Sequence, residues 1–222
     1  MLSVPLIARS LVMTVLLSAA CLRSLSQATF VVGTQEWMSE NLSVDHYWDG
    51  VPIPEAKTAA EWKNYNERKI GCYCNYDNET CYGRMYGKLY NWYAIKRGVA
   101  PKCWKVASKT DFDRLIEKIG VADAGKKLKA THSWNNEWNG TNTSGFGGFA
   151  GGCRNATGTF SFVGREGFWW TGDVRKTGSG RDGGVYFFIN SDDVINFDVS
   201  EDFGFSVRCM RYAGVAPPSP CP

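Results

Sequence analysis

The chain has 222 residues, of which 44% are hydrophobic, 14% aromatic and 21% charged. This composition is typical of a globular protein that is long enough to bury a sizeable core. The formal net charge is only +3, and two of the positive charges, Arg9 and Arg23, lie within the first 27 residues. The near-neutral remainder offers no electrostatic footprint for nucleic acid or an anionic membrane, so we expect no nucleic-acid partner.

Residues 1–27 are predicted to be a secretory signal peptide. Arg9 precedes the apolar run 11–17, which small residues follow. This run is shorter than the stretch of about 20 residues that a membrane span requires, so we expect no transmembrane segment. The prediction is a secreted, extracellular protein. The alternative is a bacterial lipoprotein that is anchored at the cell surface through Cys21, because small residues also precede this cysteine.

One strand and two short helices are predicted next. Residues 29–37 have the composition of a strand, and 55–64 contain alanines and a tryptophan separated by charges, which is compatible with a helix. A second helix is predicted over 89–95. Gly98 follows it and is expected to end it in the left-handed conformation.

The clearest predicted helix spans 108–120. Ser108 can cap its first turn, where Asp111 also lies, and Gly120 ends it. Its apolar residues share one face, which we expect to be buried in the core: they are Phe112, Leu115, Ile116 and Ile119. A weaker helix is predicted over 123–130.

The second half is predicted to consist of a long loop followed by strands. Residues 132–152 are rich in Trp, Asn, Gly, Thr and Ser, and long loops of this kind often carry function. The strands are predicted over 154–155, 159–163, 167–171, 184–189, 194–199 and 204–211.

Two of these strands have informative patterns. Side chains alternate sides along a strand, so Trp169 and Trp170 must face opposite ways. We expect one of them to enter the core and the other to cover a loop or face a groove. The last strand alternates in the same way and is predicted to be half-buried, with Phe205, Val207 and Cys209 on one side and Ser206, Arg208 and Met210 on the other.

The cysteines agree with export, because an oxidising compartment favours disulfides. Once the predicted signal peptide is removed, an odd number of cysteines remains, so one thiol is left over after pairing. Cys221 lies in the proline-rich tail 214–222 and is the candidate for this thiol, through which a disulfide-linked oligomer could form. A zinc site is disfavoured, because Cys72 and Cys74 lack the usual two-residue spacer. The cysteines predicted to form disulfides are Cys72, Cys74, Cys81, Cys103, Cys153 and Cys209.

Six segments of the chain are informative together: they are 33–42 (GTQEWMSENL), 86–94 (YGKLYNWYA), 100–106, 139–146, Trp169-Trp170 and 204–211. In this order they resemble the Fibrobacter succinogenes major paralogous domain family. The resemblance implies one compact α+β domain over 28–213, similar to the C-type-lectin-like and formylglycine-generating-enzyme-like folds. It further implies small twisted antiparallel sheets, two or three helices and long loops. It does not imply a single activity.

No catalytic constellation is evident in the sequence. His46 and His132 lie in no metal-binding or nucleophile motif. The enzymes with the formylglycine-generating fold need a pair of redox-active cysteines late in the chain, and no closely spaced cysteine precedes Cys209. We therefore expect a protein that is not an enzyme, with no cofactor other than a candidate calcium ion.

Carbohydrate or protein binding has better support. Sugar sites combine aromatic faces with Asn, Asp and Glu, and the candidate ligand-binding residues are Trp134, Asn135, Asn136, Glu137, Trp138, Asn139 and Trp170. Calcium requires oxygen ligands, for which Asp192, Asp193 and Asp198 are weak candidates, although the Glu-Pro-Asn and Trp-Asn-Asp signatures of calcium-dependent lectins are absent. Five sequons are candidate glycosylation sites: Asn41, Asn78, Asn139, Asn142 and Asn155.

The sequence thus predicts a secreted binding module that recognises carbohydrate or an extracellular matrix protein through its Trp- and Asn-rich loop. The first alternative is a secreted structural protein that is cross-linked by disulfides. The second alternative is an oxidase with the formylglycine-generating fold.

Overall fold

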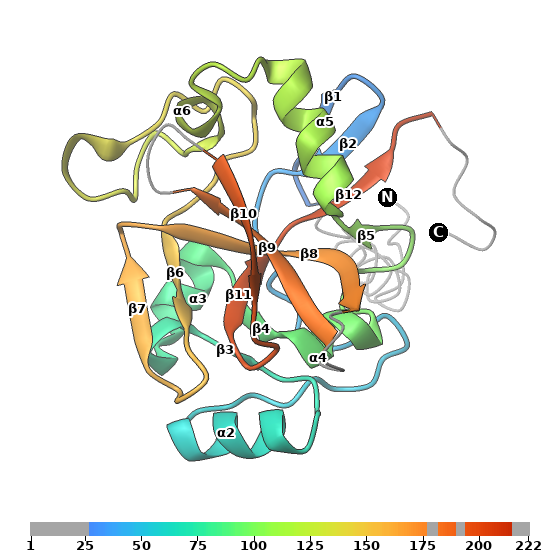
Figure 1. Ribbon diagram of the computed structural model, residues 1–222, viewed down its shortest axis with the longest axis vertical. Helices are drawn as coiled ribbons and strands as arrows, with labels where there is room; N and C mark the ends of the chain where they lie inside the picture. Colours follow the sequence, from blue (N-terminus) through green and yellow to red (C-terminus); the bar gives the residue numbers. More distant parts are fainter. Residues whose placement is uncertain (1–26, 177–181, 190–193, 215–222) are drawn as a thin grey trace, which may run out of the picture.

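The computed structural model describes residues 27–176, 182–189 and 194–214. For the residues of these ranges that lie between 174 and 198, it describes only the main chain. Its larger sheet has the strand order β10-β9-β8-β6-β11-β4-β3, with β7 paired to β6 (Figure 1). These strands are β3 (Tyr73–Cys74), β4 (Leu89–Asn91), β6 (Gly151–Arg154), β7 (Phe160–Val163), β8 (Gly167–Lys176), β9 (Asp182–Ile189), β10 (Val194–Val199) and β11 (Gly204–Val207).

The smaller sheet has the order β1-β2-β12-β5. Its strands are β1 (Thr29–Val32), β2 (Gln35–Met38), β5 (Lys105–Val106) and β12 (Cys209–Tyr212). All pairings in both sheets are antiparallel except those of β8 with β11 and with β6. The described residues also form five α-helices: α2 (Ala59–Glu67), α3 (Thr80–Tyr86), α4 (Trp92–Arg97), α5 (Lys109–Ile119) and α6 (Ala124–Leu128). The predicted α+β class is therefore confirmed.

The helix predicted with most detail is confirmed. Ser108 caps α5, and Asp111 completes a capping box by accepting a hydrogen bond from the Ser108 main chain. Burial opposes ionisation of the Asp111 carboxyl group, but hydrogen bonds from Lys105 and Ser108 outweigh burial and hold its pKa below the ordinary value. The Lys105 Nζ atom lies 2.6 Å from Asp111 Oδ2.

Two local predictions differ from the structure, and one helix was not predicted. Residues 29–37 form a hairpin rather than one strand, because Gly33 adopts a φ of 59° in a turn between β1 and β2. The helix predicted over 89–95 begins as strand β4, and only α4 is helical. Asn91 accepts a hydrogen bond from the Ala94 amide and so caps α4, while Gly98 ends it in the left-handed conformation, as expected. Helix α3 was not predicted.

Both tryptophans of the Trp169-Trp170 pair are buried in cores on opposite faces of β8. Trp170 lies in the cluster that we call the central core, together with Trp92 and Phe205. The centroid of its ring lies 5.3 Å from that of Trp92 and 4.6 Å from that of Phe205. Trp169 belongs to the α5 core, which also contains Phe112, Phe146 and Trp37. The expectation that one indole covers a loop or a groove is therefore wrong, because helices and loops cover both faces here.

The half-buried pattern predicted for 204–211 is also wrong. The segment passes from the larger sheet to the smaller sheet at Arg208, and the side chains on both of its sides are covered. Phe205, Val207 and Cys209 enter the central core, whereas Met210 enters the α5 core. Arg208 itself is fully buried.

A hydrogen-bond network accommodates the Arg208 guanidinium between the two cores. Arg208 donates to Asn41 Oδ1 through Nε and Nη2, at 3.2 and 2.7 Å, and through Nη1 to the main-chain oxygens of Met38 and Phe146. Trp169 Nε1 also donates to Asn41 Oδ1, at 2.7 Å. Because its acceptors are an amide and two carbonyls, burial lowers the pKa of Arg208 to about 9.

The disulfide prediction is wrong for five cysteines. Cys72 and Cys74 are free thiols in the α2 core, which also contains Trp62 and Tyr76, and Cys153 and Cys209 are free thiols in the central core. Buried cysteines of this kind pack as small hydrophobic side chains. Burial raises the pKa values of Cys74, Cys153 and Cys209 to about 12. Cys81 is free and exposed, whereas Cys103 is disulfide-bonded.

Candidate functional site

The loop predicted to bind a ligand is anchored by a tryptophan. Trp134 is only 4% exposed and packs in the α5 core. Its Nε1 atom donates to the main-chain oxygen of Gly148, at 2.9 Å. The ring therefore cannot stack on a ligand, and the prediction that Trp134 binds one is corrected to an anchoring role.

Trp138 is the exposed aromatic residue of this loop. It ends the 3-10 turn η2 (Asn136–Trp138), and 47% of its surface is accessible. Asn135, Glu137 and Asn139 are exposed around it, whereas the side chain of Asn136 is not described. Four predicted residues are thus exposed within one short segment, which we call the Trp138 loop (Asn135, Glu137, Trp138 and Asn139).

Hydrogen bonds hold the Trp138 loop at both ends. The main-chain N–H of Asn135 donates to the main-chain oxygen of Gly164 at 2.6 Å, which ties the loop to the turn between β7 and β8. The Trp134 amide donates to Asn139 Oδ1 at 3.1 Å, which closes the turn on itself. Trp138 is therefore presented on a fixed local structure, an arrangement that lowers the entropic cost of binding.

Trp170, the remaining predicted ligand-binding residue, lies away from any surface. It is fully buried, and its Nε1 atom donates to the Tyr90 oxygen at 2.7 Å. Its assignment to the binding site is corrected for this reason.

The calcium candidates cannot be placed together. Asp192 and Asp193 lie outside the described residues, and only the main chain of Asp198 is described, on β10. Within the ranges whose side chains are described, no group of three or more His, Cys, Asp or Glu residues is arranged to hold a metal ion. The predicted signal peptide, apart from Gln27, and Cys221 of the tail also lie outside the described residues.

The five sequons differ in accessibility. Asn41 is 4% exposed and engaged with Arg208 and Trp169, so its glycosylation in the folded protein is excluded by burial. Asn78 and Asn139 are exposed, and Asn142 and Asn155 are half-buried. The latter two accept main-chain hydrogen bonds within their own turns through Oδ1.

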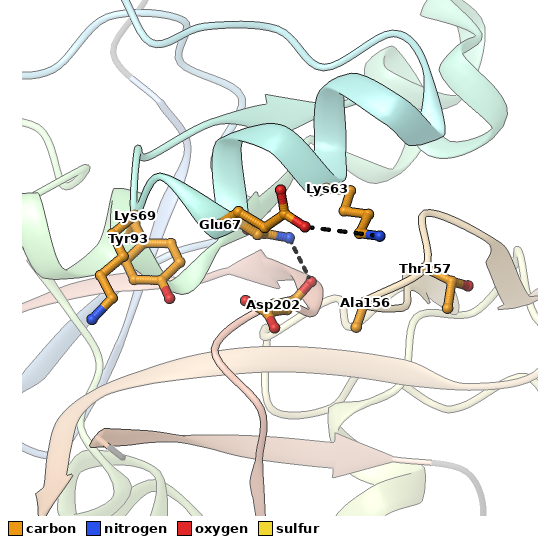
Figure 2. A pocket seen from close by; sticks show the side chains of 8 residues that line it. Lys63, Glu67, Lys69, Tyr93, Ala156, Thr157 and Asp202 are labelled. Carbon is orange, nitrogen blue, oxygen red and sulfur yellow. Dashed lines mark hydrogen bonds and ion pairs between the residues drawn. The ribbon is translucent and has the colours of Figure 1, made fainter. Parts of the chain in front are cut away.

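A pocket that the sequence analysis missed lies beside α2 (Figure 2). It has a volume of about 610 Å³, and we call it the α2 pocket. Tyr93 and Lys69 lie at one end of it, Ala156 and Thr157 at the other, and Asp202 between them. Its residues come from four separate segments, so no local motif could have revealed it: they are Lys63, Asn66, Glu67, Lys69, Tyr93, Ala156, Thr157 and Asp202.

Buried and partly buried hydrogen bonds fix one wall of the α2 pocket. Asn66 Nδ2 and Trp62 Nε1 both donate to the main-chain oxygen of Asp202, each at 3.0 Å. Asn91 Nδ2 donates to Asn66 Oδ1 at 2.8 Å and so fixes the orientation of that amide. Tyr93 donates its hydroxyl to Glu201 Oε2 at 3.0 Å, and burial and this carboxylate raise the pKa of Tyr93.

The described helices contain none that is both long and apolar enough to cross a membrane. The model of the Fibrobacter succinogenes major domain family matches residues 31–211. No curated protein and no solved structure matches the chain. Because this match covers most of the sequence, the chain belongs to the Fibrobacter succinogenes major domain family.

Proposed function

We propose that this protein is a secreted, non-enzymatic module that binds carbohydrate through the Trp138 loop. The observation that carries the proposal is the indole of Trp138, which is 47% exposed at the end of a turn whose neighbours are hydrogen-bonded in place. An aromatic face can stack on the C–H face of a sugar ring, and tryptophan is enriched among residues that dominate binding energy.

The polar residues of the Trp138 loop supply the complementary contacts. Asn135 offers a side-chain amide, Asn139 offers its Nδ2 donor beside the Oδ1 atom that the Trp134 main chain occupies, and Glu137 offers a carboxylate that accepts hydrogen bonds from hydroxyl groups. All three are exposed beside the indole. An extracellular protein is the other ligand class that this surface suits, because a rigid exposed aromatic side chain also provides contact area for binding a protein.

The alternatives receive less support. A protein cross-linked through many cysteines requires accessible thiols, yet Cys72, Cys74, Cys153 and Cys209 are buried and free. An oxidase that uses Cys209 requires a thiol that a substrate can reach, whereas Cys209 is fully buried in the central core.

The test is binding of the purified chain to a glycan array and to immobilised matrix proteins, followed by titration of each hit. We expect Trp138→Ala to weaken binding on the order of 10-fold or more, as for a central tryptophan in an interface. Trp48→Ala is the matched control, because Trp48 is a 63% exposed indole on another turn. Absence of any hit, or equal binding by the Trp138→Ala variant, would refute the proposal.

A further inference from the structure

The α2 pocket lies far from the Trp138 loop and offers a different surface. In Figure 1 α2 lies at the bottom of the molecule, whereas the loop that follows α6 lies at the upper left. The volume of about 610 Å³ falls within the range of roughly 300–1,000 Å³ that is usual for small-molecule sites.

The charges around the α2 pocket balance. Lys63 and Lys69 contribute two ammonium groups, and Glu67 and Asp202 contribute two carboxylates. Lys63 Nζ lies 3.8 Å from Glu67 Oε1, so part of this charge is already paired at the rim. A phosphate would meet two carboxylates and a cation would meet two ammonium groups. The pocket therefore suits a ligand without net charge.

The remaining lining groups favour a hydroxylated ligand. Thr157 is exposed, and its hydroxyl, which donates to Asn155 Oδ1 at 2.7 Å, can still accept a hydrogen bond. Asp202 offers a carboxylate, and Tyr93 offers a half-buried ring with a hydroxyl at its edge. Ala156 is the single aliphatic residue among those that line the pocket. An apolar ligand would remove water from these polar groups and offer no hydrogen bonds in place of those made to water, which costs free energy.

The wall that carries Asp202 is preorganised for binding. Trp62 and Asn66 fix the main-chain oxygen of Asp202, and Asn66 is itself 4% exposed and held by Asn91. A wall that is ordered before the ligand arrives reduces the entropic cost of association.

We propose that the α2 pocket binds one uncharged saccharide residue, as a second carbohydrate site that is separate from the Trp138 loop. The ring of Tyr93 contacts the C–H face of the sugar, and Asp202, Thr157 and the lysines bond its hydroxyl groups. The proposal shares its ligand class with the proposed function but rests on different residues, so either can fail alone.

The test is an NMR titration of the folded chain with glucose, galactose, mannose and N-acetylglucosamine, each added separately. We expect saturable amide shifts at Lys69, Tyr93, Thr157 and Asp202 for at least one sugar, with a dissociation constant on the order of 1 mM for so small a ligand. Inorganic phosphate and cyclohexanol are the charged and apolar comparison ligands.

Two variants separate this site from the Trp138 loop. Ala156→Trp fills the α2 pocket without removing a side-chain hydrogen bond, and it should abolish the pocket shifts while the dispersion of the spectrum shows an intact fold. Trp138→Ala should leave the pocket shifts unchanged, whatever it does to binding at the loop. The proposal is overturned if no sugar gives saturable shifts in the pocket, if phosphate or cyclohexanol binds there more tightly, or if the shifts persist in Ala156→Trp.

Discussion

Replacement of Asn41 by alanine is expected to destabilise the fold strongly. Asn41 Oδ1 accepts hydrogen bonds from Arg208 Nε, Arg208 Nη2 and Trp169 Nε1, and its Nδ2 donates to the Tyr86 oxygen at 2.8 Å. The residue is 4% exposed and Arg208 is fully buried. Asn41→Ala therefore removes the acceptor of three donors, two of which belong to a buried cation.

The magnitude follows from the cost of unsatisfied buried groups. Each costs about 1–3 kcal/mol, and a partner stripped from a buried charge costs about 3–5 kcal/mol. Arg208 keeps its bonds to the Met38 and Phe146 oxygens, so we expect a total of about 3–5 kcal/mol rather than the sum of all terms. With an m value of about 2 kcal/mol/M, the urea midpoint should fall by about 2 M.

The assay is urea unfolding followed by tryptophan fluorescence at pH 7, with equal m values required for the comparison. Asn64→Ala is the control, because Asn64 is exposed on α2 and the change should alter stability by about 0.5 kcal/mol at most. If Asn41→Ala costs less than about 1 kcal/mol, Asn41 is not the acceptor that compensates the burial of the Arg208 guanidinium.

Three further outcomes are expected. Ellman's reagent should label Cys81 in the folded protein, while Cys74, Cys153 and Cys209 should react only after unfolding, because burial raises their pKa values to about 12; rapid native labelling that peptide mapping with a mass-tagged thiol reagent locates at Cys74, Cys153 or Cys209 would contradict this. The lowered pKa of Asp111 stabilises the fold above pH 3.8, so the stability difference between wild type and Asp111→Asn should shrink as the pH falls below that value, and a constant difference would count against it. In a eukaryotic secretory host, peptide mass mapping of the folded fraction should find Asn41 unglycosylated.

The parts of the fold that the sequence predicted correctly depend on local chemistry. The capping box of Ser108 and Asp111 and the left-handed Gly98 are properties of a few neighbouring residues, and both appear as expected. Gly33 shows the limit of this reasoning, since a turn at a single glycine divides an otherwise continuous strand pattern.

The errors arise where tertiary contacts decide burial. Alternation along Trp169 and Trp170 correctly separates their faces, yet it cannot show that a core covers each face. The same applies to Arg208, because an arginine on a strand normally indicates solvent, and its acceptors come from residues more than 60 positions away in the chain. The disulfide prediction depends mainly on the expected oxidising compartment, and the packing of the cysteines into cores cannot be read from their spacing.

The segment 200–212 connects both candidate binding regions to the core. At its beginning, the main-chain oxygen of Asp202 is held by Trp62 and Asn66 and forms one wall of the α2 pocket. At its junction between the sheets, Arg208 binds the Phe146 oxygen, two residues before Gly148, whose oxygen anchors Trp134. One segment that passes through both sheets therefore positions two separate surfaces, because its main chain and Arg208 hold the residues from which each surface projects.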